Sequence, residues 1–325
     1  MKVFVCGASG FIGSAICKRL AADGHEVVRG VRSSRAVGEV AIDFSEDVAA
    51  ESWVGRLAGI DAVVNAVGII VETRGGRFEE VHHRAPAAVF AACARVGVKR
   101  VIQISALGAD GGDTGYFRTK FAADRALMAL PLQWTILRPS LVYGEDGDSS
   151  RMFRTLASMH VIPVPGLGTA RFQPVHVEDL VESVSACLRP DAVTGRSVDL
   201  VGTTAVSYRD MINTYRRAMG FGAALYVTVP ALLMAVSAWA SGFIPGAPLN
   251  PETWRMLKAG SAGDVAGITR LIGRPPKGIA EFIEKNDAER LAASALKEWR
   301  PRVLQVLAAV AVVLALYFLV FRRSA

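Results

Sequence analysis

Short apolar runs alternate with stretches of helical periodicity through the first half of the chain. The runs are rich in valine and isoleucine, as expected for strands buried on both faces of a parallel sheet. This alternation predicts an α/β fold with a doubly wound parallel sheet of the Rossmann type. The strands are expected at residues 2–6, 26–32, 40–43, 61–67, 100–105 and 134–138, and the helices at 14–22, 49–57, 85–96 and 116–130.

The second half of the chain is less regular. The pattern predicts helices at 175–188 and 208–219 and a late strand at 197–201. Residues 226–249 are apolar but interrupted by proline and glycine, so we expect a surface-lying or buried helix there rather than a membrane span. We therefore expect an NAD(P)-binding domain over 1–225 with interleaved substrate-side segments, a small membrane-apposed C-terminal cap over 226–300, and a transmembrane tail anchor over 301–323.

The tail anchor is predicted from an uncharged stretch at residues 303–321, which has arginines on both sides. At about 1.5 Å per residue a helix of this length reaches about 28 Å, close to the thickness of a bilayer's hydrocarbon core. A buried core helix is the alternative. Basic residues are more numerous before the stretch than after it, and the N-terminus does not resemble a signal peptide. We expect the main domain on the cytoplasmic face of the inner membrane, with a single-pass C-terminal anchor.

Composition changes this picture only slightly. The formal net charge is +7 and half of the residues are apolar. No basic run is interleaved with aromatic residues, so no nucleic-acid partner is expected, and the cysteines and histidines show no metal-ligand spacing, so no metal is expected. The excess positive charge suits phosphate-bearing cofactors and anionic lipid.

A glycine triplet lies between the first predicted strand and the following helix. Its spacing, G-x-x-G-x-x-G, permits a tight turn, a close approach of pyrophosphate to the backbone, and close packing of helix on strand. Phosphates would meet the unpaired N–H groups and the positive end of the helix. The expected cofactor contacts in this loop are Gly7, Ser9, Gly10, Phe11, Ile12 and Gly13.

The end of the second strand bears on the choice of cofactor. NAD enzymes usually place a carboxylate there to hold the ribose hydroxyls, but residues 29–35 contain none. Arg32, Ser33 and Arg35 would instead bind a 2′-phosphate. The sequence therefore favours NADP(H), with NAD(H) as the alternative if these arginines are merely solvated.

Further cofactor contacts are expected where the third and fourth strands end. Asp43 would accept a hydrogen bond from the adenine amino group, and the small residues near the end of the fourth strand would let the cofactor pass. A role in turns is the alternative for both sites. The residues expected at the fourth strand are Asn65, Ala66, Val67 and Gly68.

Several spaced motifs resemble the extended and atypical short-chain dehydrogenase/reductase superfamily. They read GASGFIG, VNAVGI, ISALGA, YFRTK, ILRPSLVYG and FQPVHVEDL. They look most like the atypical branch that contains the NADPH-binding accessory subunit of respiratory complex I and its bacterial relatives. The resemblance covers about residues 1–285.

The resemblance implies a catalytic set of Ser105, Tyr116 and Lys120, of which Tyr116 and Lys120 would also contact the cofactor. Tyr116 and Lys120 are four residues apart at a helix start and so share one face. A tyrosine with its pKa lowered by a neighbouring ammonium and by the nicotinamide charge would exchange a proton with a substrate oxygen during hydride transfer, while Ser105 would hold that oxygen. The alternative is a relic tyrosine without turnover. Arg171 and His176 are expected on the substrate side, although Arg171 could equally form a surface salt bridge.

Three functions are compatible with these features. The first is an oxidoreductase that uses NADP(H) on a lipophilic carbonyl or alcohol at the membrane. The second is a non-catalytic NADP(H)-binding structural or sensor subunit of a membrane complex of the respiratory type. The third is a sugar-nucleotide epimerase or dehydratase, which the Ser105-Ala106 pair disfavours because the resemblance implies a Ser/Thr-rich stretch there.

Overall fold

The computed structural model describes residues 1–73, 75–242, 247 and 249–297. The chain divides into two compact units. The first comprises Met1–Gly144, Gln173–Ala205 and Ser261–Gly278, and the second comprises Glu145–Phe172, Val206–Gly260 and the described residues from Ile279 onward. The boundaries expected after residues 225 and 300 stay predictions, because compactness does not test where the functional regions begin and end.

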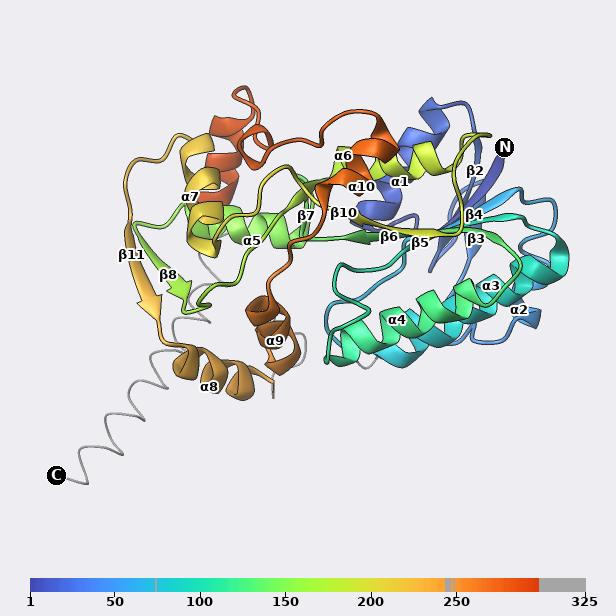
Figure 1. Ribbon diagram of the computed structural model, residues 1–325, viewed down its shortest axis with the longest axis horizontal. Coiled ribbons are helices and arrows are strands. Elements are labelled where there is room, and N and C mark those ends of the chain that lie inside the picture. Colours follow the sequence, from blue (N-terminus) through green and yellow to red (C-terminus); the bar gives the residue numbers. More distant parts are fainter. Residues whose placement is uncertain (74, 243–246, 248, 298–325) are drawn as a thin grey trace. The chain divides into compact units, whose positions relative to one another are not determined.

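A parallel sheet forms the centre of the first unit (Figure 1). Its strand order is β10-β6-β5-β4-β1-β2-β3, with β1 between β2 and β4, and every neighbouring pair is parallel. The predicted α/β class and doubly wound parallel sheet are confirmed. The strands are β1 (Lys2–Cys6), β2 (Glu26–Val31), β3 (Glu39–Ala41), β4 (Ala62–Asn65), β5 (Arg100–Ile104), β6 (Gln133–Pro139) and β10 (Arg196–Leu200).

Helices cover both faces of this sheet because successive side chains of each strand point to opposite sides. In β1, Val3 and Val5 join the core under α1, α6 and α10, whereas Phe4 and Cys6 join the core under α2, α3 and α4. Figure 1 shows these helix groups on opposite sides of the strands. Their bounds are α1 (Phe11–Ala22), α2 (Glu51–Val54), η1 (Glu79–Arg84, a π-helical turn), α3 (Ala85–Val96), α4 (Gly115–Met128), α6 (Val177–Cys187) and α10 (Val265–Ile272).

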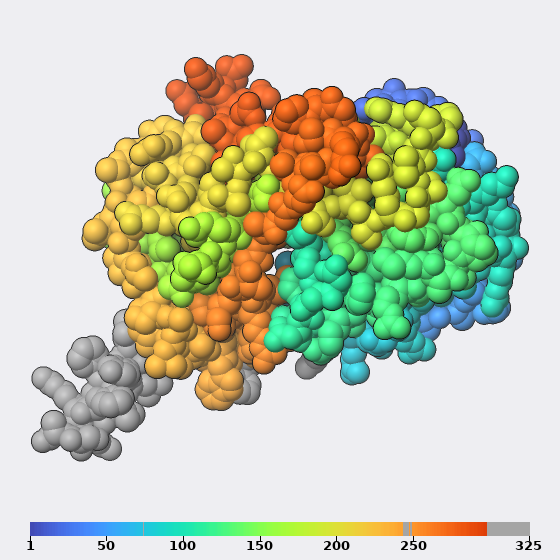
Figure 2. Space-filling model, in the orientation of Figure 1, coloured from blue at the N-terminus to red at the C-terminus, as the bar shows by residue number. Residues whose placement is uncertain are grey.

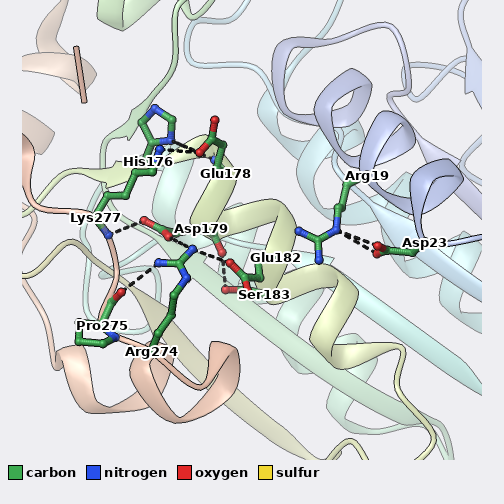
Figure 3. Close-up of polar contacts among 10 residues, drawn as sticks. All are labelled: Arg19, Asp23, His176, Glu178, Asp179, Glu182, Ser183, Arg274, Pro275 and Lys277. Carbon is green, nitrogen blue, oxygen red and sulfur yellow. Dashed lines mark hydrogen bonds and ion pairs between the residues drawn. The ribbon is translucent and has the colours of Figure 1, made fainter. Parts of the chain in front are cut away.

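A buried carboxylate fastens the last segment of the first unit to α6 (Figure 3). Asp179 has no exposed surface, accepts the backbone N–H of Lys277 at 2.8 Å and pairs with the Arg274 guanidinium at 2.7 Å. Arg274 also pairs with Glu182 at 2.5 Å. The Arg274 side chain is 41% exposed, so the pair joins a buried carboxylate to a partly solvated guanidinium. Strands β7 (Val142–Tyr143) and β9 (Val175–His176) form a short parallel pair in this unit, and β9 directly precedes α6 in the chain.

The second unit is mainly helical. It contains α5 (Asp148–Ala157), β8 (Val161–Pro165), α7 (Tyr208–Ala218), β11 (Leu225–Val229), α8 (Ala231–Ser241), α9 (Pro251–Ala259) and the 3₁₀ turn η2 (Ile279–Glu281).

The expectation of a helix starting at residue 226 is wrong. Residues Leu225–Val229 form strand β11, which pairs in parallel with β8. Pairing with a strand distant in sequence outweighs the local apolar pattern, and Pro230 marks the change to α8. The helix expected in this region is therefore shorter and comprises only Ala231–Ser241.

The described residues contain no helix that is long and apolar enough to cross a membrane. The predicted tail anchor at 301–323 lies outside the described residues. It stays a prediction from the sequence.

Candidate functional site

The glycine loop, residues 7–13, is built so that two of its positions exclude any side chain. Gly7 follows β1 with φ +79° in the left-handed region, and a Cβ there would lie 3.1 Å from a Val67 methyl group. A Cβ on Gly13 would lie 2.0 Å from the carbonyl oxygen of Gly7. The N–H groups of Gly7 and Ala8 both donate to the carbonyl of Gly30 at 3.1 Å, which ties the loop to β2. The loop therefore needs glycine for its own backbone path.

The first turn of α1 presents backbone donors at the end of this loop. Gly10 is the N-cap residue, and among the described residues no side chain caps it or places an acidic group in the first turn. Ser9 and Gly10 are exposed, and Phe11 and Ile12 are half-buried. An uncapped helix N-terminus beside a glycine loop suits a phosphate group, because its N–H groups and dipole favour negative charge.

The two predicted arginines lie in an exposed loop, residues 32–38, between β2 and β3. Glu39 shapes this loop: its carboxylate accepts the N–H groups of Arg35 at 2.8 Å and Ala36 at 3.2 Å, and it lies 3.6 Å from Arg29. The hydrogen bond from Arg35 is the main cause of a lowered Glu39 pKa. Arg32, Ser33 and Arg35 are all exposed, so their side chains can reach a ligand at the end of β2.

Asp43 and the residues after β4 form turns at the same edge of the sheet. Asp43 lies two residues beyond β3 and accepts the N–H of Ser45 at 2.8 Å, which is the turn role that the sequence left open. Asn65 is fully buried, bonds Gln103 on β5 at 2.8 Å and accepts the N–H of Val67 at 3.2 Å. The chain then continues through Ala66 and Val67, both half-buried, to the exposed Gly68.

The three residues implied by the resemblance lie with Asp124 at helix α4. We term this group the α4 cluster: Ser105, Tyr116, Lys120 and Asp124. Ser105 follows β5, is almost fully buried, and its hydroxyl donates to the Asp124 carboxylate at 2.8 Å. The Lys120 ammonium donates to the carbonyl oxygens of Val67 at 3.2 Å and Ile104 at 3.1 Å, where strands β4 and β5 end. The structure thus brings the predicted set to the edge of the sheet that carries the glycine loop.

Tyr116 lies among aromatic rings. Phe78, His82 and Phe117 contact its ring edge-on, with centroids 5.1–6.0 Å away. Burial raises the pKa of Tyr116 to about 12. Desolvation of the phenolate raises this pKa in the protein by itself, whereas the lowering expected from a neighbouring ammonium together with the nicotinamide charge stays a prediction for the nucleotide-bound protein.

Burial sets the protonation of the other members too. It lowers the pKa of Lys120 to about 8, opposed by the charge of Asp124, and raises the pKa of Asp124 from 3.8 to about 6. Arg138 lies 3.5 Å from Asp124 and so helps to keep that carboxylate charged. Burial and the Lys120 charge lower the pKa of His82 to about 2, so the ring is neutral and its Nε2 accepts the N–H of Ile69 at 3.0 Å.

Sequence reasoning missed three of these groups. Asp124 could have been found, because it is four residues beyond Lys120 and eight beyond Tyr116, on the same helix face. Arg138, within the ILRPSLVYG motif, and His82, on the π-helical turn η1, had no such signal, since neither turn geometry nor strand packing is visible in spacing.

The two residues expected on the substrate side belong to different units. Arg171, in the second unit, is exposed and donates to the carbonyls of Thr169 and Ala170 in its own loop. His176, in the first unit, is the N-cap of α6, where its Nδ1 accepts the N–H of Glu178 at 3.3 Å. The expected substrate role of each stays a prediction.

Neither metal binding nor a disulfide finds support in the described part of the chain. No group of three or more histidine, cysteine, aspartate or glutamate side chains there could hold a metal ion. The four cysteines are buried and unpaired with one another, as small apolar residues would be. The site is therefore one of backbone donors, arginines and the α4 cluster.

Comparison with known proteins agrees with this geometry. Residues 3–200 match the model of the NAD dependent epimerase/dehydratase family. The chain belongs to that family. A nucleotide cofactor of the NAD(P) type is typical of it, which agrees with the glycine loop after β1 and confirms the superfamily recognised from the motifs.

Curated relatives point to the branch expected from the sequence. The mitochondrial NADH dehydrogenase [ubiquinone] 1 alpha subcomplex subunit 9 of Arabidopsis thaliana is 32% identical over 213 residues, which is 61% of this chain and 53% of that protein. The subunit of the same name from Mus musculus is 29% identical over 202 residues, 58% of this chain and 54% of that protein. The chain spans about half the length of the curated relatives it matches.

Solved structures share the fold at lower identity. A nucleoside-diphosphate-sugar epimerase from Staphylococcus aureus has a TM-score of 0.71 at 19% identity, covering 87% of this chain and 99% of that one. Human epimerase family protein SDR39U1, solved with NADPH, has a TM-score of 0.69 at 19% identity, covering 89% and 99%. At this identity the likeness concerns the fold alone.

Proposed function

We propose that this protein binds NADP(H) tightly as a non-catalytic structural or sensor subunit of a membrane complex. The observations that carry the proposal are the hydrogen bonding within the α4 cluster and the raised pKa of Tyr116. The Ser105 hydroxyl donates a hydrogen bond to the Asp124 carboxylate at 2.8 Å, and burial raises the pKa of Tyr116 to about 12. A general acid or base works best with a pKa near the working pH, and the pKa of this tyrosine lies above that range when no nucleotide is bound.

The glycine loop and its neighbours supply the binding. The pyrophosphate would lie against Gly7–Gly13 and the start of α1, where side chains are excluded and no acidic residue repels it. Arg32 and Arg35, with Ser33, would hold the 2′-phosphate that distinguishes NADP(H) from NAD(H). Bound nicotinamide would supply hydride chemistry, but each of these residues acts by binding and orientation.

The membrane setting is proposed from the sequence and the relatives. The uncharged stretch at 303–321 would anchor the chain, with the nucleotide unit on the cytoplasmic face of the inner membrane. The similar proteins from Arabidopsis thaliana and Mus musculus are named as subunits of an NADH dehydrogenase. A respiratory-type membrane complex is therefore the partner that this proposal names.

The test begins with the full chain purified in detergent. Bound nucleotide is extracted and identified, and NADPH and NADH are titrated by fluorescence into the wild type and the Tyr116→Phe variant. We expect NADPH to co-purify or to bind more tightly than NADH, with affinities of the two proteins within about twofold. Absence of binding to either nucleotide would overturn the proposal.

A second candidate is hydride transfer to a lipophilic carbonyl or from an alcohol. The observation in its favour is the position of Lys120, whose ammonium lies at the strand ends close to Gly68. A Cβ added to Gly68 would lie 3.2 Å from that ammonium. A quinone- or isoprenoid-like carbonyl that oxidises NADPH with the wild type but not with Tyr116→Phe would establish it over the first. An epimerase would in addition require affinity for a nucleoside diphosphate sugar.

A further inference from the structure

One face of α8 consists of exposed apolar side chains. Leu232, Val236 and Trp239 are 75%, 40% and 64% exposed, and their spacing of four and three residues places them on one side of the helix. Ser237 and Ala238 are buried instead, and the helix packs against α9. The segment from β11 through α8, orange-yellow in Figure 2, lies partly uncovered on the face shown.

The strand pair before α8 carries exposed apolar side chains as well. Leu225 of β11 pairs with Val161 of β8, and the two side chains are 63% and 50% exposed, while Val227 is 44% exposed. The opposite face of β11 packs on α7, where the Tyr226 hydroxyl bonds Asn213 at 3.2 Å and Arg209 lies over the Tyr226 ring. The ribbon thus turns its apolar side away from its own core.

The charge pattern around this surface is uneven. No charged residue occurs between Arg217 and Glu252, a stretch that includes β11 and α8. Arg217 before it and Arg255 and Lys258 after it are exposed, whereas Glu252, which closes the stretch, is half-buried. An uncharged apolar face with tryptophan and with basic residues at its margins is typical of segments that lie in a membrane interface.

We propose that this surface docks on the headgroup and acyl-chain boundary of an anionic bilayer. We term it the α8 face and define it as Val161, Leu225, Val227, Leu232, Val236 and Trp239. The proposal rests on the membrane attachment put forward above. Val303, where the apolar stretch at 303–321 begins, lies six residues beyond Lys297, the last described residue of the same unit, and six residues reach at most about 22 Å. A bilayer entered by that stretch would thus be within short reach of this unit.

The test uses the full chain in phosphatidylcholine/phosphatidylglycerol vesicles. An environment-sensitive fluorophore is attached through Leu232→Cys or, in a second variant, Trp239→Cys. The four native cysteines are buried, so labelling is directed to the new thiol. Val193→Cys is the matched control, because Val193 is 60% exposed and belongs to the first unit.

In vesicles we expect blue-shifted emission at positions 232 and 239, strong quenching by brominated lipid, and weak quenching by aqueous iodide. The label at 193 should behave in the opposite way. Labels at 232 and 239 that stay as open to iodide as the label at 193 would overturn the proposal. A blue shift that resists brominated lipid and grows with the protein-to-lipid ratio would also overturn it, in favour of a second copy on this face.

Two controls separate this inference from the proposed function. Carbonate extraction reports whether the chain stays with the vesicles, and an NADPH titration reports on the first unit. Water-exposed labels on a chain that resists extraction and binds NADPH would overturn only the α8 face. Release of the chain by carbonate would overturn the membrane attachment as well, with nucleotide binding judged separately by its titration.

Discussion

The glycine loop and the α4 cluster border the same edge of one sheet but are built in different ways. The loop is made of backbone: Gly7 and Gly13 leave no room for side chains, and the start of α1 is uncapped. The cluster is made of side chains: Ser105 bonds Asp124, Lys120 bonds the Ile104 carbonyl, and aromatic rings contact Tyr116. The first region is arranged to receive an anion, whereas the second is held together by internal hydrogen bonds, with one buried oxygen of Asp124, Oδ1, left without a hydrogen-bond partner among the described residues.

Under the proposed function, this difference would let one fold keep nucleotide binding while losing acid–base chemistry. Backbone donors at a helix N-terminus bind phosphate whatever the neighbouring side chains do. Acid–base catalysis depends on a pKa near the working pH, and burial shifts the pKa of Tyr116 away from that range. The two regions should therefore respond differently to substitution, and the following variants test this from the largest effect to the smallest.

Replacing Gly13 by alanine should break the glycine loop. The added Cβ would lie 2.0 Å from the Gly7 carbonyl oxygen and 2.7 Å from its carbon, so the backbone must move. Overpacking of this kind costs about 1–3 kcal/mol of stability. We expect NADPH affinity to fall at least about 100-fold, which is about 2.7 kcal/mol of binding. Fluorescence titration and thermal unfolding measure the two effects.

Gly55→Ala is the matched control for Gly13→Ala. Gly55 has helical backbone angles, φ −68° and ψ −34°, and no atom within 4 Å of an added Cβ. This change should leave NADPH affinity unaltered and stability equal or higher by up to about 1 kcal/mol. If Gly13→Ala retained wild-type affinity, the loop could not be the phosphate site.

Replacing Asp124 by asparagine tests whether the raised pKa of Asp124 makes the stability of the fold depend on pH. Burial raises the Asp124 pKa from 3.8 to about 6, so the folded protein holds this proton more tightly than the unfolded chain does. Stability from this group therefore increases as pH falls through the window between about 6 and 4, and asparagine removes that gain. The wild type should gain about 2 kcal/mol over Asp124→Asn between pH 7 and pH 4.

Urea unfolding of both proteins at several pH values measures this difference, in which the shared titrating groups cancel. A constant gap between the two proteins would mean that Asp124 keeps an ordinary pKa and that the cluster is open to water. Any loss of NADPH affinity in Asp124→Asn at pH 7 beyond about threefold would mean that loop and cluster act together.

Replacing Arg32 by glutamate sharpens the cofactor side of the comparison. A charge-assisted bond to phosphate is worth about 1.5–3 kcal/mol, so NADPH affinity should fall about 10- to 100-fold. NADH affinity should change little, because NADH lacks the 2′-phosphate. Arg209→Glu, an exposed arginine in the second unit, is the control. Equal losses for both nucleotides would show that Arg32 supports the loop in general rather than the 2′-phosphate.

The sequence was sufficient to predict the sheet and the glycine loop because both depend on local pattern. Valine-rich runs mark strands buried on both faces, and a glycine triplet between strand and helix has one backbone explanation. β11 was missed because its pairing with β8 joins residues far apart in the chain, and the tertiary contact outweighs the apolar pattern of the segment.

The α4 cluster could be located from the sequence but not interpreted. Spacing placed Tyr116 and Lys120 on one helix face at the correct edge of the sheet. It could not show that the Ser105 hydroxyl points to Asp124 or that aromatic rings contact Tyr116, because both depend on how α4 packs on the sheet and η1. The sign of the Tyr116 pKa shift follows from that packing alone.

The smallest effect is expected from Thr114→Ala, at the helix that carries the cluster. Thr114 is the N-cap of α4, and its hydroxyl accepts the N–H of Phe117 at 3.2 Å. Loss of such a cap costs about 1 kcal/mol. Ser207→Ala, which removes the N-cap bond to Asp210 on α7 in the second unit, should cost a similar amount.

Neither cap variant should change NADPH affinity if the glycine loop and its arginines supply the binding. Loosening the start of α4 affects Tyr116 and Lys120 directly, whereas the start of α7 belongs to the other unit. A fall of about tenfold in NADPH affinity for Thr114→Ala but not for Ser207→Ala would correspond to about 1.4 kcal/mol of binding. That result would show that the α4 cluster also holds the nucleotide and would break the separation between the two regions, since equal fold stabilities leave only the position of α4 to explain it.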